Sequence, residues 1–139
     1  MLSNTHFSIG VHVLCSLAYH EGRYVGSEEL AATVGTNASF LRGLIGQLRD
    51  AGLVETQLGK GGGTTLAWPA TELTLRDVYR ATGVETAGPT HVCDRKSKCV
   101  VARGMEDVLS GINERLDVAV DAELGKVTIA SLLDSLTEH

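Results

Sequence analysis

Two cysteines, Cys93 and Cys99, enclose a short charged run in the second half of the chain. Five residues separate them, Asp94 to Lys98, and three of these carry a positive charge. Neighbouring cations favour the thiolate form of a cysteine, which is the reactive form. The pair therefore predicts a redox or electrophile sensor. The two thiols could also close a small disulfide loop, provided that their Cα atoms come within about 7 Å.

The same two cysteines have other interpretations. A metal or iron–sulfur site would need a further ligand, either from His91 or from a second subunit. Two reduced thiols on a solvated loop would have no special chemistry. Cys15 lies in the apolar stretch from Phe7 to Tyr19, where a small buried cysteine is common. A thiol that reacts across a dimer is the second interpretation of Cys15.

The sequence predicts neither an enzyme nor a membrane protein. It shows no paired catalytic carboxylates, no nucleophile elbow and no triad. The longest apolar stretch is too short and too interrupted to span a membrane. No Lys or Arg precedes the first apolar run, unlike in a secretory signal. Three cysteines are too few for a disulfide framework, so we expect a reducing, cytoplasmic environment.

The first half of the chain predicts three helices. Between Phe7 and Tyr19, apolar residues recur at helical spacing and predict one buried face, made of Phe7, Val11, Leu14 and Ala18. Ser27 is the predicted N-cap of a second helix that ends at Gly35. Asn37 opens a third helix, which runs to about Ala51. A short turn containing glycine joins the second and third helices, and this is the pattern of a helix-turn-helix.

A β-hairpin is predicted directly after the third helix. Its strands are residues 53–56 and 64–68, and a glycine-rich turn of residues 57–63 joins them. A phosphate-binding loop is not a good interpretation of this turn, because a strand and not a helix follows it. A helix-turn-helix followed by such a hairpin is a winged helix. The predicted fold class is therefore mainly α with a small β-hairpin.

The second half predicts a dimerisation helix. Thr74 and Asp77 cap a short helix that ends near Ala81. Residues 100–124 form the longest predicted helix, and Thr128 caps a last short helix. Little of the chain is left to cover the long helix, so a second copy is its natural partner. Its apolar positions are Val101, Met105, Val108, Ile112, Leu116 and Val120.

The predicted domains are a winged helix-turn-helix over residues 1–83, a sensor loop over 84–99, and a dimerisation helix with a C-terminal helix over 100–139. The net charge of −5 argues mildly against nucleic-acid binding. The excess of acidic residues lies mostly after residue 68, however. The first half could therefore still dock on phosphates if Arg42, Arg49 and Lys60 share a face.

The candidate DNA contacts lie on the third helix and at the tip of the hairpin. Polar residues near the start of the third helix should face the major groove, where an arginine can bind guanine through two hydrogen bonds. Glycines at the hairpin tip allow the backbone to approach DNA closely. An ordinary solvated helix face and a hairpin without a partner are the alternatives. The predicted contacts are Asn37, Ser39, Arg42, Lys60, Gly61 and Gly62.

Several segments, in this order, resemble the Rrf2 family of bacterial winged-helix regulators. The segments are residues 27–31 (SEELA), 37–41 (NASFL), 48–54 (LRDAGLV), 59–63 (GKGGG) and 73–80 (LTLRDVYR). The resemblance covers nearly the whole chain. It implies a dimer, a palindromic DNA target and often a sensor in the loop before the long helix. The family includes an iron–sulfur cluster regulator and a nitric-oxide-sensing repressor.

The resemblance also bears on the cofactor. Cluster-binding members carry three cysteines at five-residue separations, whereas here Met105 stands at the third position. A thioether is a poor iron ligand, so we expect no cofactor. If a cluster were bound, Cys93, Cys99 and His91 would be its ligands.

We therefore predict a homodimeric DNA-binding transcriptional regulator, a repressor with a thiol sensor made of Cys93, Cys99 and Cys15. The alternatives are an iron–sulfur cluster regulator and a winged-helix interaction module that no longer binds DNA.

Overall fold

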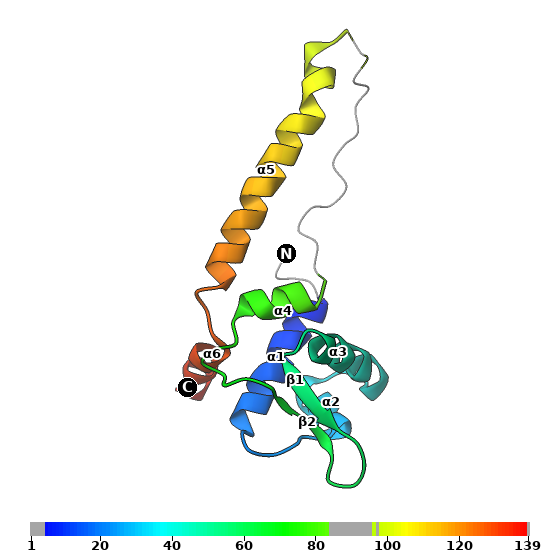
Figure 1. Ribbon diagram of the computed structural model, residues 1–139, viewed down its shortest axis with the longest axis vertical. Helices are drawn as coiled ribbons and strands as arrows, with labels where there is room; N and C mark the ends of the chain where they lie inside the picture. Colours follow the sequence, from blue (N-terminus) through cyan, green and yellow to red (C-terminus); the bar gives the residue numbers. More distant parts are fainter. Residues whose placement is uncertain (1–4, 84–95, 97, 139) are drawn as a thin grey trace. The chain divides into compact units, whose positions relative to one another are not determined.

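The computed structural model describes residues 5–83, 96 and 98–138. These residues belong to two compact units. The first unit comprises the chain up to residue 84 together with residues 124–139, and the second comprises residues 85–123. In the first unit, helices surround a central helix and a two-stranded hairpin lies to one side (Figure 1). The fold is that of a winged helix-turn-helix, as the sequence predicted.

The central helix is α1, Thr5–Tyr19. Its apolar side chains supply much of the core, and Val13 and Leu14 are completely buried. The sequence predicted one apolar face that includes Phe7 and Val11. Phe7 is buried, but Val11 is only half-buried. Burial extends around α1 to Leu17 because other helices and the hairpin pack against it from several directions.

The helix-turn-helix consists of α2, Ser27–Val34, and α3, Ala38–Asp50. The prediction that Ser27 caps α2 is wrong. The N-cap is Gly26, which has no side chain that could accept a capping hydrogen bond. The helix begins here because the extended backbone of Val25, which pairs with Thr64, continues only through Gly26 (ψ 151°). Asn37 does cap α3, and its Oδ1 accepts a hydrogen bond of 2.7 Å from the backbone N–H of Phe40.

The wing is an antiparallel hairpin of β1, Val54–Gln57, and β2, Gly63–Leu66. The first strand starts one residue later than predicted, and the second strand starts one residue earlier. Val25 extends this small sheet, since it exchanges two backbone hydrogen bonds of 2.9 Å with Thr64. This pairing fixes the hairpin to the segment that leads into α2.

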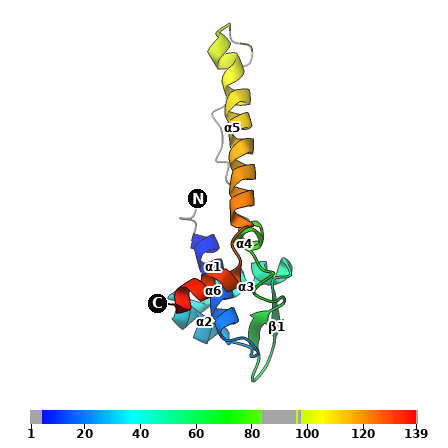
Figure 2. The same cartoon turned by 90° about the vertical axis from the view of Figure 1, so that its left-hand side faces the viewer.

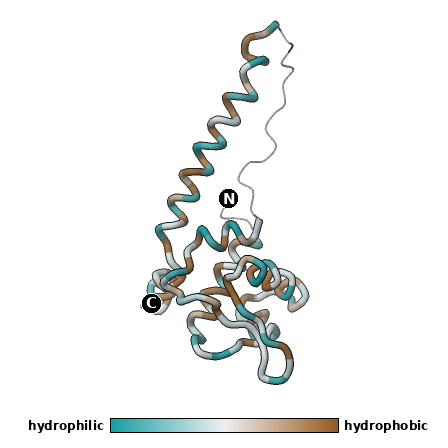
Figure 3. The backbone as a smooth tube through the Cα atoms, in the orientation of Figure 1, coloured by the Kyte–Doolittle hydropathy of each residue, from teal (hydrophilic) through white to brown (hydrophobic). Residues whose placement is uncertain are grey.

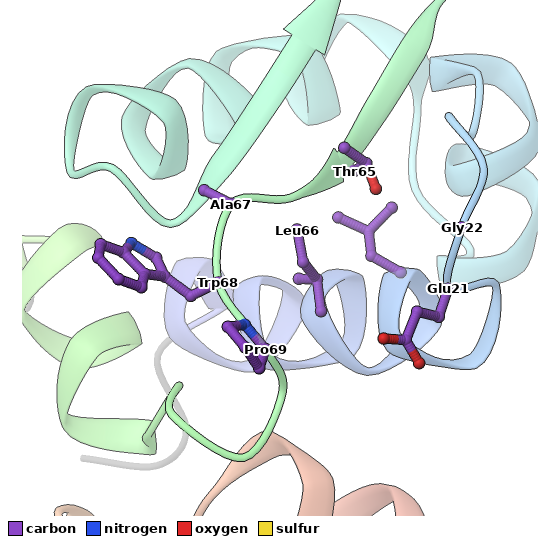
Figure 4. Close-up of a pocket in the computed structure, with 8 residues that line it drawn as sticks. Glu21, Gly22, Thr65, Leu66, Ala67, Trp68 and Pro69 are labelled. Atoms are coloured by element: carbon purple, nitrogen blue, oxygen red, sulfur yellow. The ribbon is translucent and has the colours of Figure 1, made fainter.

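Trp68 follows the hairpin and contacts the segment at the C-terminal end of α3. Its indole Nε1–H donates a 3.0 Å hydrogen bond to the carbonyl of Gly52. A groove of about 280 Å³ lies beside it. Figure 4 shows Trp68 and Glu21 at opposite ends of this groove, with Leu66 and Pro69 between them.

Helix α4, Leu75–Ala81, begins with the predicted capping box between Thr74 and Asp77. Helix α6, Ile129–Thr137, begins with a second box made by Thr128 and Ser131. Backbone hydrogen bonds join the two helix starts, from Leu75 N–H to the carbonyl of Val127 and from Ile129 N–H to that of Leu73. The sequence grouped the last helix with the long helix, but α6 lies in the first unit and packs along α1 (Figure 2).

The long helix α5, Val100–Leu124, has the predicted bounds. Brown apolar positions recur along it between teal polar ones (Figure 3). Val108 is 59% exposed and Leu116 is 51% exposed. Val101 and Ile112, which lie at the same helical spacing, are exposed as well.

Candidate nucleic-acid interface

The exposed face of α3 carries the residues that the sequence proposed for DNA contact. Asn37, Ser39 and Arg42 are all exposed, while Leu41, Leu44, Ile45 and Leu48 hold the opposite face in the core. The Asn37 oxygen is used as the helix cap, which leaves its amide N–H groups to donate. Burial of one face of α3 thus fixes the orientation of the other.

A groove of about 220 Å³ separates α3 from the wing. Arg42 and Arg49 both line it from α3, because residues seven apart return to one helix face. Thr56 and Gln57 line it from β1. The groove thus combines two guanidinium groups with polar side chains, and this suits an anionic, hydrogen-bonding partner.

Arg49 was not among the predicted contacts. Sequence reasoning included it only as a cation that would need to share a face with Arg42 and Lys60. The structure brings Arg42 and Arg49 together, but Lys60 lies at the exposed wing tip and not in the groove. The two arginines and the lysine therefore form separate parts of the candidate interface. The seven-residue spacing on α3 was the signal that could have identified Arg49.

The wing tip depends on glycine in two ways. Gly59 and Gly61 have positive φ angles, 92° and 81°. Gly62 and Gly63 lie so close to other backbone atoms that a Cβ would overlap the carbonyl of Gln57 or of Val25. These constraints hold Lys60 on a defined turn, closed by a 3.0 Å hydrogen bond from Gly62 N–H to the Gly59 carbonyl.

Replacing Gly63 by alanine should destabilise the protein by about 1–3 kcal/mol, the usual cost of a strained backbone position. The added Cβ would collide with the Val25 carbonyl, and the φ of +152° is unfavourable for alanine. Gly43→Ala is the matched control. A Cβ there meets nothing, and removing a glycine from a helix should stabilise by about 0.5–1 kcal/mol. Thermal unfolding of both variants checks this, and equal melting temperatures would contradict it.

The described thiols differ in environment. Cys15 is 6% exposed in α1, and burial raises the pKa of its thiol. A raised pKa keeps the thiol protonated and poorly reactive, which supports a packing role. Cys99 is exposed directly before α5, and its carbonyl accepts a 3.1 Å hydrogen bond from Arg103 N–H. Cys93 and His91, the other proposed sensor or ligand residues, lie outside the described residues.

The described residues include only part of the ligand set proposed for an iron–sulfur cluster. Within residues 5–83, 96 and 98–138, no three His, Cys, Asp or Glu side chains gather as a metal site. Cys99 is the one candidate ligand of the predicted set in these ranges, and Met105 occupies the third cysteine position. No helix among the described residues is long and apolar enough to cross a bilayer.

The helix-turn-helix, the wing and the groove between them define the class of winged-helix DNA-binding proteins. The model of the Rrf2 family, which is described as an iron-dependent transcriptional regulator, matches residues 3–135 of the chain. The chain therefore belongs to the Rrf2 family. This family consists of transcriptional regulators and not of enzymes.

The relatives agree with this assignment. A putative HTH-type transcriptional regulator of Neisseria meningitidis, NMA1593, is 33% identical over 96 residues, which are 69% of this chain and 62% of the relative. The chain therefore spans less than two thirds of that relative. A putative transcriptional regulator from Lactobacillus plantarum has a similar structure (TM-score 0.79, 26% identity), with 96% of this chain and 91% of that chain covered. IscR of T. potens has the same fold (TM-score 0.73, 23% identity, 98% and 88% covered).

Proposed function

We propose that the protein is a homodimeric repressor that binds a palindromic DNA operator in the cytoplasm. The observation that carries the proposal is the groove between α3 and the wing, which Arg42 and Arg49 both line. A chain with a net charge of −5 cannot hold DNA by bulk attraction, so local placement of cations must do so. Asn37 and Ser39 are exposed at the start of the same helix.

The proposed contacts divide into two kinds. Arg42, Ser39 and the Asn37 amide would read base edges, because residues near the start of a recognition helix enter the major groove. Lys60, together with the backbone of Gly61 and Gly62, would contact phosphates, which carry no sequence information. Arg49 lines the same groove, further along the same face of α3 than Arg42.

The dimer part of the proposal rests on α5. Large apolar side chains along the helix are exposed in the described chain, among them Val101, Val108, Ile112 and Leu116. Leaving each in water forgoes about 1.5–3 kcal/mol of burial energy. A second copy of the same helix would cover them and would pair two recognition helices with two half-sites.

The experiment that tests the proposal is selection from a library of random DNA duplexes with the full chain. The expected product is an inverted repeat whose binding weakens steeply as salt is raised, because Lys and Arg release counterions from phosphates. Failure to enrich any sequence, with weak binding that is insensitive to salt, would contradict the proposal and favour an interaction module. Visible absorbance of anaerobically purified protein would favour the alternative of an iron–sulfur cluster regulator.

The proposed signal is oxidation at Cys99. This thiol lies directly before α5, which is the proposed dimer helix, and it is exposed. Peroxide would oxidise the thiol to a sulfenic acid with release of one water. The thiol of Cys93 would then displace a second water to form a disulfide. Such a change at the start of α5 would alter the separation of the two recognition helices, and half-site spacing tolerates little error.

We expect peroxide to weaken operator binding of the parent protein about 5- to 150-fold, the range that corresponds to a coupling of about 1–3 kcal/mol. Cys99→Ser should bind the operator as the parent does before oxidation and should lose the response. Cys15→Ala is the matched control and should keep it, because Cys15 is buried with a raised pKa. Fluorescence anisotropy with the selected duplex measures all three. A response that survives in Cys99→Ser would exclude Cys99 as the sensor.

A further inference from the structure

Trp68 lines two grooves. The first is the groove that it shares with Glu21, and the second has a volume of about 380 Å³. The indole of Trp68 points away from Glu21 (Figure 4). We call the second groove the Trp68 groove, and it lies within the first compact unit. Its lining residues are Ala51, Leu53, Trp68, Glu72, Leu73 and Asp77.

The Trp68 groove is acidic. Glu72 and Asp77 line it, and no other described residue of its lining carries a charge. Within residues 5–83, 96 and 98–138, neither carboxylate forms an ion pair with a lysine or an arginine. The groove beside the wing has the opposite character, because Arg42 and Arg49 line it. The Trp68 groove therefore favours a cationic partner and disfavours the phosphates of DNA.

Local hydrogen bonds hold the three polar groups of this groove in place. The Trp68 indole is bonded to the Gly52 carbonyl, as described above. The backbone N–H of Glu72 donates a 2.9 Å bond to the Pro69 carbonyl, which closes the turn that carries Glu72. Asp77 Oδ2 accepts a 2.9 Å bond from the backbone N–H of the residue that caps α4. A carboxylate has about four acceptor sites, so Asp77 can accept further bonds from a ligand.

The uncharged part of the lining specifies the shape of the cation. Trp68 is 56% exposed although its N–H is bonded, and the face of an indole attracts cations, arginine more often than lysine. Leu53 and Leu73 line the same groove from the core. The aliphatic stem of an arginine can lie along such apolar surface while its guanidinium group meets polar partners. An arginine side chain therefore complements the leucines, the indole and the carboxylates together.

Other cations complement only part of this lining. Quaternary ammonium groups are held by cages of several aromatic rings, whereas Trp68 is the single aromatic residue among the described residues of the lining. The described residues also contain no group of three side chains that could hold a metal ion. The ammonium group of a lysine neither stacks as a plane nor binds a carboxylate through two parallel hydrogen bonds.

We propose that the Trp68 groove is an interaction surface for a basic, arginine-bearing segment of a partner protein. The guanidinium group would stack on Trp68 and donate to Glu72 and Asp77. The candidate base contacts lie at the start of α3, whereas Trp68 is bonded just beyond the end of this helix, which is about 20 Å long. DNA and the partner would therefore occupy different ends of α3. The proposal does not depend on DNA binding, on the dimer or on the oxidation of Cys99.

The test uses Trp68 itself, because it is the only tryptophan of the chain and its fluorescence reports on this groove. The probe is a capped five-residue peptide of alternating glycine and arginine, titrated into the full-length chain without DNA. We expect a saturable change of fluorescence, with an affinity that falls as salt is raised. The same peptide with citrulline, the neutral isostere of arginine, should give no saturable change.

Glu72→Lys should weaken the affinity for the peptide at least about tenfold, because it places a like charge beside the arginine. Glu28→Lys is the matched control. It makes the same change of charge at an exposed position on α2, outside the groove, and should bind the peptide as the parent does. Circular dichroism melting verifies that both variants remain folded.

Three results would overturn the proposal. The first is a fluorescence of Trp68 that does not change, or that changes equally with the arginine and citrulline peptides. The second is an equal loss of affinity in Glu72→Lys and Glu28→Lys, which would show attraction by net charge alone. The third is a lower molecular mass of Glu72→Lys than of the parent, which would show that a second copy of the chain occupies the groove.

Discussion

Replacing Ile112 and Leu116 together by lysine is expected to convert the protein to a monomer and to weaken operator binding about 100-fold or more. Both side chains lie on the exposed apolar side of α5, one turn apart. In a symmetric dimer each substitution acts twice, so four apolar contacts would be replaced by four like charges. Loss of the second half-site removes an avidity that can reach about 10²–10⁴. Light scattering and anisotropy measure the two effects.

Val118→Lys is the control for this double variant. Val118 is 70% exposed on the same helix, but it follows Leu116 by only two residues and so points to the other side of α5. It should stay dimeric and should bind the operator normally. A parent protein that is already a monomer of 14.7 kDa would contradict the dimer proposal. So would a double variant that retains the parent mass.

Arg42→Ala should lower specific DNA affinity by about 1–3 kcal/mol, the usual value of a bidentate contact to a base. The loss should be confined to the selected operator, and random duplexes should bind nearly as before. Lys60→Ala should weaken both kinds of DNA and reduce the salt slope by about one unit, because it removes one phosphate contact. Anisotropy titrations over a range of salt concentrations separate the two behaviours.

Arg115→Ala serves as the control for Arg42→Ala, because it removes the same charge from an exposed position on α5. It should leave the specific affinity unchanged. If Arg42→Ala and Lys60→Ala both bind the operator as the parent does, the recognition surface has been placed incorrectly. If Arg42→Ala weakens all duplexes equally, Arg42 contacts phosphates and the base-reading role passes to another residue of α3.

Local signals explain why much of the fold could be predicted from the sequence. The caps at Asn37 and Thr74 involve side chains within three residues of their partners, so the sequence contains both groups of each bond. The bounds of α5 follow from periodicity and from Gly125. The prediction of the α2 cap was wrong because it depends on a distant residue. Val25 pairs with Thr64, nearly forty residues away, and this pairing decides where the extended backbone before α2 ends.

The parts of the sites that depend on tertiary packing could not be predicted. Arg42 was proposed from its place on α3, but the groove shared with Arg49 also needs β1, whose distance from α3 no local pattern encodes. The packing partner of α6 could not be predicted for the same reason. Its apolar residues could have packed on a second chain. In the structure α6 packs along α1, and backbone hydrogen bonds join residues 127–129 to residues 73–75.

Sedimentation velocity of the protein with a fluorescent duplex from the selection tests the central proposal most directly, because it reports binding and stoichiometry together. We predict a single complex of two chains on one duplex, which dissociates as salt is raised and does not form with a scrambled duplex of equal length. A duplex that sediments unchanged at every protein concentration would contradict DNA binding. A complex with one chain per duplex would contradict the dimeric regulator proposed here.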